Sequence, residues 1–166
     1  MRAKQLIESL VEVAKPAERS GWTRIITAAY GLYTLAYSYH WKAKGENYYS
    51  DHLLFQRLYE ATEEDIDPIA EKAIGTTDDD TFLNALLLLE GAAMWVTRWD
   101  PSGTSVCSEF VNNLLMAETD FIDEVGTVKQ EFENKEMLTN GIDDFLQALA
   151  NKHEEHVYLL RQRRRK

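Results

Sequence analysis

The stretch from Trp22 to His40 reads WTRIITAAYGLYTLAYSYH, and it decides the fold class. Its apolar residues recur at intervals of three and four, which is the spacing of one face of an α-helix. These residues are Trp22, Ile25, Ile26, Ala29, Leu32, Tyr33 and Ala36. The helix should end near Lys44 and Gly45, because glycine readily takes the left-handed conformation that closes a helix. The stretch therefore predicts an amphipathic helix with one buried side.

The remaining sequence continues this helical pattern. Only three prolines and eight glycines interrupt the 166 residues, and strand-like alternation is hard to find. Ser50 is a good N-cap for a second helix that runs towards Gly75 and is interrupted at Pro68. Further helices are expected over residues 105–132 and 142–162, with a short helix over 82–89 before the turn at 100–103. Four long helices with a helical segment in the middle connection predict an all-α four-helix bundle with one crossover.

Length and composition indicate one soluble domain over residues 1–160, followed by a basic tail, RQRRRK, over residues 161–166. The first sixteen residues, MRAKQLIESLVEVAKP, lack the apolar core of a signal peptide. The longest apolar run, Ala85 to Leu89, is far too short to span a membrane. Cys107 is the single cysteine, which fits a reducing compartment. The cytoplasm is therefore the expected location.

Charge is distributed unevenly along the chain. The net charge is −10, yet five of the 18 basic residues lie in the last six positions. The body of the protein is therefore strongly acidic, so that it attracts cations and repels nucleic acid, whereas the tail could do the opposite. Both cations and nucleic acid remain candidate partners.

Candidate metal ligands come from two predicted helices. Imidazole and carboxylate groups together suit iron and other first-row divalent ions. His40 closes the first helix and His52 opens the second, while Asp67 and Glu71 lie four residues apart on one face of that second helix. At about 1.5 Å per residue, His52 is roughly 22 Å from Asp67 on a straight helix. These residues cannot share an ion within one subunit.

Two subunits could complete such a site. If two copies of the second helix pack antiparallel about a two-fold axis, His52 of one chain meets Asp67 and Glu71 of the other, and the contact creates two identical sites. Bundles with metal sites in their cores instead carry Glu-x-x-His on core helices, and the sequence has no such spacing. The sequence therefore favours a site between subunits.

The segment from His40 to His52, HWKAKGENYYSDH, resembles a motif of the Dps family of miniature ferritins. The resemblance continues through Phe55, Tyr59, Asp67, Ile69, Ala70, Glu71 and Gly75, and into the last predicted helix at Asp144, Phe145, Leu146, Leu149, His156, Leu159, Leu160 and Arg161. It implies a ferritin-like bundle and a dodecameric hollow shell. In that family, sites between subunits oxidise Fe(II), usually with hydrogen peroxide, and ferric iron is stored inside as a mineral.

The resemblance also implies roles for residues outside the ligand set. Trp41 would either pack at the interface or absorb oxidising equivalents beside the iron. Asp144, with Asp143 beside it, would line an acidic iron-entry pore, although a carboxylate in the first turn of a helix is also stabilised by the helix dipole.

Two residues depart from the family pattern. Gln56 stands four residues after His52, where family members commonly have an acidic residue, and a neutral amide is a poorer ligand for a second iron ion. Asp67 and Pro68 would suit the N-cap and first position of a restarted helix, and a capping Asp67 would point at backbone amides instead of a metal. Both departures predict weakened ferroxidase activity.

Two further groups of residues have both a functional interpretation and an ordinary structural one. The basic residues Arg161, Arg163, Arg164, Arg165 and Lys166 could bind DNA weakly and in a salt-dependent way, but a solvated helix end is favoured. His153 and His156, three residues apart, could bind a surface metal, but solvent contact beside Glu154 and Glu155 is favoured.

Three functional hypotheses remain open. The leading one is an enzyme and store, a ferroxidase miniferritin that binds iron. The second is a DNA-compacting shell protein whose iron chemistry is weakened by Gln56 and Pro68. The third is a structural bundle that keeps the shell and binds another cation.

Overall fold

The computed structural model describes residues 20–165 of the chain. The first nineteen residues, which include the stretch MRAKQLIESLVEVAKP considered above, and Lys166 lie outside the described range. Five α-helices account for most of that range, and no strand occurs within it. They are α2 (Gly21–Lys42), α3 (Tyr48–Thr77), α4 (Ala85–Trp99), α5 (Cys107–Asn134) and α6 (Asn140–Arg164), with a short 3-10 helix, η2 (Thr81–Leu83), before α4. The expected all-α class is confirmed.

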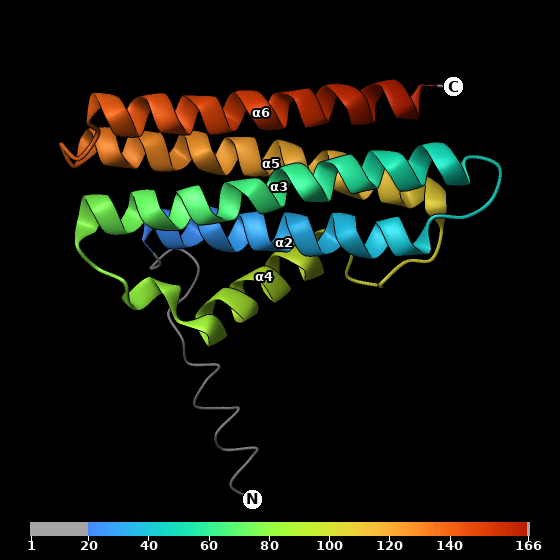
Figure 1. Ribbon diagram of the computed structural model, residues 1–166, viewed down its shortest axis with the longest axis horizontal. Helices are drawn as coiled ribbons and strands as arrows, with labels where there is room; N and C mark the ends of the chain where they lie inside the picture. Colours follow the sequence, from blue (N-terminus) through green and yellow to red (C-terminus); the bar gives the residue numbers. More distant parts are fainter. Residues whose placement is uncertain (1–19, 166) are drawn as a thin grey trace, which may run out of the picture.

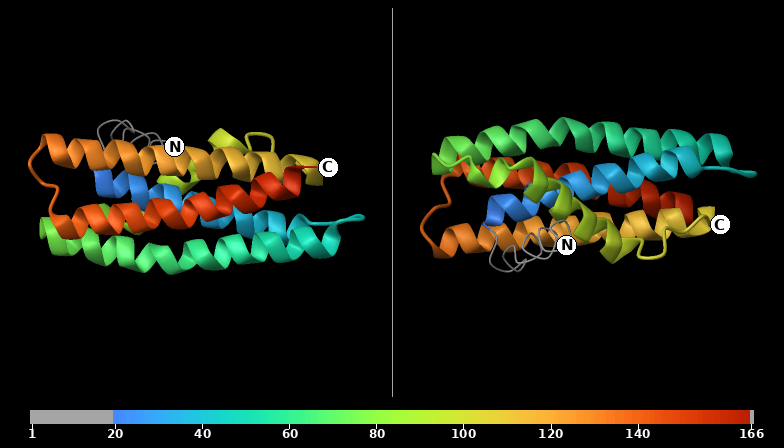
Figure 2. Two further views of the ribbon diagram at one scale, coloured as in Figure 1. Left: turned by 90° about the horizontal axis from the view of Figure 1, so that it is seen from above. Right: turned by 90° about the horizontal axis from the view of Figure 1, so that it is seen from below.

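The four long helices α2, α3, α5 and α6 form a bundle, and α4 crosses obliquely against α2 on its outer side (Figures 1 and 2). Helices α3 and α5 run in the same direction, so the segment that contains η2 and α4 must return along the bundle between them (Figure 1). This is the single crossover that the sequence predicted. No helix in the described range is long and apolar enough to cross a membrane.

Two predicted features of α3 were wrong. Ser50 is not the N-cap, because α3 already begins at Tyr48, and the Ser50 hydroxyl donates to the carbonyl of Asn47 at 3.0 Å from inside the helix. Pro68 does not interrupt α3, which continues on both sides of it. A helix can lose one amide donor at proline when tertiary packing holds its axis, and Ile69, directly after Pro68, is fully buried. The helix in the crossover is also longer than expected.

Local sequence explains the starts of two of the long helices. The Ser20 side chain accepts a hydrogen bond from the amide of Thr23, and Thr139 caps α6 in the same way through Ile142. Gly45 has φ of +84° in the loop after α2, where the left-handed conformation was expected. Ser20 and Thr139 thus fix where α2 and α6 begin, whereas α3 and α5 start without a side-chain cap.

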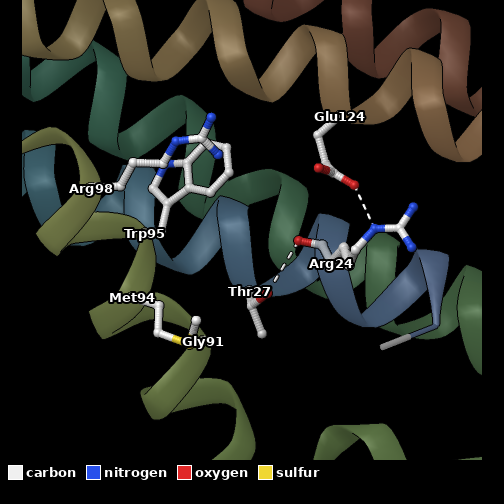
Figure 3. A pocket seen from close by; sticks show the side chains of 7 residues that line it. All are labelled: Arg24, Thr27, Gly91, Met94, Trp95, Arg98 and Glu124. Atoms are coloured by element: carbon white, nitrogen blue, oxygen red, sulfur yellow. Dashed lines mark hydrogen bonds and ion pairs between the residues drawn. The ribbon is translucent and has the colours of Figure 1, made fainter. Parts of the chain in front are cut away.

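One close approach sets the position of α4. A β-carbon added to Gly31 of α2 would lie 2.6 Å from the side-chain atoms Cβ and Cδ1 of Trp95. Only glycine therefore lets α4 lie this close to α2. Beside this crossing is a cavity of about 310 Å³ whose wall includes Met94 and Trp95 of α4 (Figure 3). The charged residues of its wall are paired: Arg24 donates to Glu124 at 2.6 Å, and Arg98 lies 3.0 Å from Asp120.

Candidate metal centres

His40 in the last turn of α2 and His52 near the start of α3 lie face to face. Their ring centroids are 3.7 Å apart and the ring planes are inclined by 24°. The Nδ1 atom of each ring lies 3.0 Å from the backbone oxygen of the other residue. The carbonyl of His40 is one of those that a helix end leaves without an intrahelical partner. The structure therefore brings together the two histidines that the sequence singled out.

This pairing fixes which ring nitrogen is available. A backbone carbonyl only accepts hydrogen bonds, so the Nδ1 atoms of His40 and His52 must carry the hydrogens. In neutral imidazole the other nitrogen, Nε2, then has a free lone pair, and a hydrogen bond from Nδ1 to a carbonyl is the usual support of a metal-binding histidine. Neither Nε2 atom has a hydrogen-bond partner among residues 20–165, and neither is buried. Both rings are therefore oriented for ligation.

Oxidisable aromatic residues surround the histidine pair. The Tyr37 ring is 4.1 Å from Trp41 and 4.6 Å from Tyr59, measured between centroids. The Tyr59 ring stands edge-on to His40 at 5.3 Å. Trp41 keeps 67% of its surface exposed, which is unusual for a tryptophan in a monomeric surface. Its predicted roles, interface packing and uptake of oxidising equivalents, both suit this position.

Asp67 and Glu71 lie much further along α3. Because α3 is unbroken, Asp67 is roughly 22 Å from His52 along the helix axis. The two carboxylates are exposed and have no hydrogen-bond or ion-pair partner within the described range. Asp67 is not a helix cap, contrary to one expectation, and instead lines a groove of about 440 Å³ with Tyr30, Tyr33 and Glu63. Within one chain the four predicted ligands therefore form two separate halves.

Gln56 points along the surface of α3. Its side-chain amide nitrogen donates to Glu60 at 2.7 Å, and its carbonyl oxygen is the atom that could face a metal ion. A neutral oxygen beside an exposed carboxylate is a weak ligand set for a second ion. The weaker second iron position stays a prediction.

A second histidine group lies in the interior of the bundle and corrects the sequence prediction. His153 and His156 were expected in solvent, but they are 0% and 3% exposed. Both face Glu118 of α5, which is also buried: its two carboxylate oxygens lie 2.5 Å from Nδ1 of His153 and 3.1 Å from Nδ1 of His156. One candidate ligand atom from each of these three residues lies within 4.8 Å of the others. We call this group the core cluster.

In the absence of a metal ion, opposite charges on Glu118 and His153 stabilise the core cluster. Burial by itself raises the pKa of Glu118, but the neighbouring His153 and His156 outweigh it and lower that pKa to about 2. Burial lowers the pKa of His153, whereas Glu118 and Asp65 raise it more strongly, to about 9. The protein thus has a paired charge in its interior.

Asp65 of α3 is attached to the outer side of the core cluster. Its Oδ2 atom is 3.4 Å from Nε2 of His153, and its Oδ1 atom accepts from Lys152 at 2.8 Å. Lys152 also donates to the carbonyl of Ala61 at 2.7 Å. The core cluster therefore links three of the four long helices.

Comparison with known proteins identifies the family of the chain. It is 30% identical over 140 residues to an uncharacterized low temperature-induced protein of Nostoc sp. (strain PCC 7120), which covers 80% of this chain and 72% of the relative. A homologue of that protein in Anabaena variabilis has the same identity and coverage. The chain belongs to the family of these low temperature-induced proteins.

A further relative carries a more informative name. The DNA protection during starvation protein of Brevibacillus brevis is 27% identical over 158 residues, covering 95% of this chain and 96% of the relative. This similarity supports the resemblance to Dps and ferritin-like proteins. No protein-family model matches the chain, and no solved structure matches it.

The predicted pore and DNA residues have mixed environments in this member of the low temperature-induced protein family. Asp144 is exposed and lies just beyond the first turn of α6, because that helix begins at Asn140, two residues earlier than predicted. Asp143 is in the first turn and pairs with Lys129 at 2.6 Å. Most of the basic segment is helical, because α6 extends to Arg164. Arg163 is engaged in a bidentate ion pair with the buried carboxylate of Asp51. Arg161, Arg164 and Arg165 remain exposed.

Sequence reasoning missed Glu118 and Asp65. Both lie among many other acidic residues on amphipathic helices, and nothing in their immediate sequence separates them from solvated carboxylates. A usable signal was present for Glu118: it occupies a position between Ala117 and Phe121 on the apolar face of α5, where a carboxylate requires a buried partner. In this family member the partners are His153 and His156.

Proposed function

We propose that the chain is a Dps-like miniferritin subunit that oxidises Fe(II) at sites between subunits. The observation that carries the proposal is the His40 and His52 pair, whose Nδ1 atoms are both fixed by backbone carbonyls and whose Nε2 atoms are accessible. A pair of imidazoles preorganised in this way provides two nitrogen ligands at no further ordering cost. The full-length similarity to a DNA protection during starvation protein supports the family assignment.

The carboxylate half of the site would come from a second subunit. A two-fold arrangement of antiparallel α3 helices puts the histidines of one chain at the groove that contains Asp67 in the other. The carboxylates of Asp67 and Glu71, and Glu63 in the same groove, supply the hard oxygen ligands that Fe(II) and Fe(III) require. In this proposal iron is the substrate, and the complete site exists only in the assembled protein.

An exposed apolar surface on α4 supports assembly. Leu86 and Leu89 keep 62% and 66% of their surface exposed, and Met94 on the same helix keeps 45%. Leu86 and Leu89 are three residues apart and so lie on one face of α4, and such an exposed apolar pair favours burial against another subunit. We propose the dodecameric shell of the Dps family as the final assembly and the cytoplasm as its location.

The reaction balances with hydrogen peroxide as the oxidant. Each peroxide accepts one electron from each of two Fe(II) ions and, with two protons, yields two water molecules and two Fe(III) ions. The chain's own residues hold Fe(II) and orient it, while Trp41 and Tyr37 beside the histidines offer electrons to any excess oxidant. Ferric iron would then pass to the interior of the shell and form a mineral.

Anaerobic titration with Fe(II), followed by addition of peroxide, tests this function. Absorbance measures the ferric product, and light scattering on the same sample measures particle size. Saturable Fe(II) binding, rapid oxidation and a particle much larger than a monomer are expected. A monomer at neutral pH that oxidises Fe(II) no faster than buffer would contradict the proposal.

DNA binding is a second candidate function. The exposed Arg161, Arg164 and Arg165 favour it, as does the name of the Brevibacillus brevis relative. Multiple copies of these weak sites in one shell would add through avidity. The acidic body opposes it, so we expect binding only at low ionic strength.

A further inference from the structure

The core cluster has the composition of a metal site that is separate from the proposed ferroxidase site. Its donors are two imidazole nitrogens and a carboxylate, contributed by α5 and α6 of a single chain. His153 and His156 lie three residues apart and so face the same direction from α6. None of its residues belongs to the set His40, His52, Asp67 and Glu71, and the core cluster is complete within one subunit.

We propose that Glu118, His153 and His156 bind one divalent first-row transition ion, of the Zn²⁺ or Fe²⁺ type, inside each subunit. Two nitrogens and one carboxylate oxygen are the donors that such ions prefer. Mg²⁺ and Ca²⁺ are disfavoured, because they require oxygen ligands almost exclusively. Three protein ligands leave a fourth coordination position for a water molecule or for the second oxygen of Glu118.

Asp65 is placed to support His153 as a metal ligand. The Nε2 atom of His153 and the Oδ2 atom of Asp65 are buried and lack a well-formed hydrogen bond among residues 20–165, although they are only 3.4 Å apart. Buried polar atoms in proteins are rarely left in this state. A metal on Nδ1 of His153 requires the hydrogen to be on Nε2, directed towards Asp65. This is the carboxylate, histidine and metal arrangement that orients ligands in many metal sites.

The surroundings would retain a bound ion. The ring of Phe121 lies 4.3 Å from that of His153, centroid to centroid, and Glu118 is only 1% exposed. Lys152 pairs with Asp65 and thereby offsets its charge. An ion bound here would connect α5 to α6 directly and to α3 through Asp65, so its main effect would be to stabilise the bundle.

Metal content and thermal stability test this site. The protein is stripped with a chelator, reloaded with Zn²⁺ alone or with Fe²⁺ alone under anaerobic conditions, and the tightly bound ions are counted after desalting. The measurement uses a His52→Ala background, so that ions at the proposed interface site do not enter the count. About one retained ion per chain is expected, with a rise in Tm of roughly 5 to 10 °C at a hundredfold excess over Kd. The comparison of the two arms identifies which ion the site prefers.

Matched variants assign the retained ion to the core cluster. Glu118→Gln keeps the shape of the side chain but removes its charge, and it should abolish both the retained ion and the rise in Tm. Glu154→Gln makes the same chemical change at an exposed position of α6 and should alter neither. Retention of the same number of ions by a folded Glu118→Gln variant would overturn the proposal.

A measurement on unaltered protein keeps the test decisive even if Glu118→Gln does not fold. Anomalous scattering from crystals grown with Zn²⁺ should place an ion about 2 Å from the Nδ1 atoms of His153 and His156. Zinc found only elsewhere, with the core cluster empty at saturating Zn²⁺, would show that the cluster is a protonated ion pair and not a metal site. Neither the ion count nor the anomalous scattering depends on ferroxidase activity. A failure of the proposed function can therefore be distinguished from a failure of this metal site.

Discussion

Arg163 near the end of α6 forms a bidentate ion pair with Asp51, the residue before His52 at the start of α3. The Asp51 side chain is only 3% exposed, whereas that of Arg163 is 31% exposed. One pair therefore joins the basic segment to the helix turn that carries a candidate iron ligand. It also separates Arg163 from the other arginines of the segment, which are free to contact a nucleic acid.

The first prediction uses this difference. Arg163→Ala should destabilise the protein by about 2 kcal/mol, since it leaves a buried carboxylate without its charged donor, but it should weaken DNA binding little. Replacing Arg161, Arg164 and Arg165 together by alanine should leave stability nearly unchanged and eliminate low-salt DNA binding. Urea unfolding and DNA mobility shifts measure the two effects. If the triple variant still bound DNA at low salt, the DNA-binding surface would lie elsewhere.

The second prediction concerns the histidine pair. His52→Ala should slow rapid Fe(II) oxidation by roughly tenfold or more, because it removes a ligand and also the hydrogen bond to the carbonyl of His40. The particle should remain intact, since His52 is only partly buried. Stopped-flow absorbance and light scattering provide the two readouts. Ser50→Ala, an exposed change in the same turn, is the control, and equal rates in both variants would exclude His52 as a ligand.

The third prediction concerns the weaker iron position. Gln56→Asp should tighten the second Fe(II) binding step, because a carboxylate replaces an amide that now donates to Glu60. Gln56→Asn has nearly the same size without the charge and should not have this effect. Anaerobic isothermal titration distinguishes the two. If both variants resemble the parent protein, Gln56 lies outside the coordination sphere.

The fourth prediction concerns the stability of the metal-free protein as a function of pH. The raised pKa of His153, about 9, gives stability that is complete below about pH 6.5 and is lost as the pH rises through 9. The lowered pKa of Glu118, about 2, gives stability that is present above about pH 4.5 and is lost as the pH falls through 2. Urea unfolding of chelator-treated protein should therefore show falling stability between roughly pH 6.5 and 9. Glu118→Gln should flatten this alkaline decline, and a rise in stability over the same range would contradict the pairing.

The fifth prediction concerns assembly. Leu89→Asp puts a charge beside the exposed Leu86 of α4 and should reduce particle mass, because burying an unpaired carboxylate at an interface is unfavourable. Ser102→Asp, in the exposed turn after α4, is the matched control and should assemble normally. Light scattering at equal protein concentration measures both. Unchanged mass for Leu89→Asp would mean that subunits meet through another surface.

The sequence was sufficient for the architecture because hydrophobic periodicity is a local signal. The spacing from Trp22 to Ala36 fixed a buried helix face, and the structure has that helix within a few residues of the expected ends. Pro68 was misjudged because the rule applied to it describes an isolated helix. In the protein, the burial of Ile69 and Ala73 holds the chain in helical form beyond the proline.

The candidate sites were predictable to different degrees. His40 and His52 were found because they are close in sequence, on either side of one loop, and the spacing itself brings them together. The core cluster was missed because it depends on which helix faces meet: Glu118 is 35 residues from His153 along the chain. The flanking Glu154 and Glu155 suggested an exposed helix face, whereas the helix period places these two on the opposite side from His153 and His156.

The close approach of Gly31 to Trp95 has a consequence for how related sequences can vary. The β-carbon of any larger residue at position 31 would collide with the β-carbon of Trp95. The β-carbon of Trp95 is fixed by the backbone, so side-chain rotation cannot relieve this collision. A homologue that acquires alanine or serine there must accept a smaller residue at position 95 or a displaced α4. Residues 31 and 95 should therefore change together, and homologues that keep both should also keep the angle at which the crossover helix lies on the bundle.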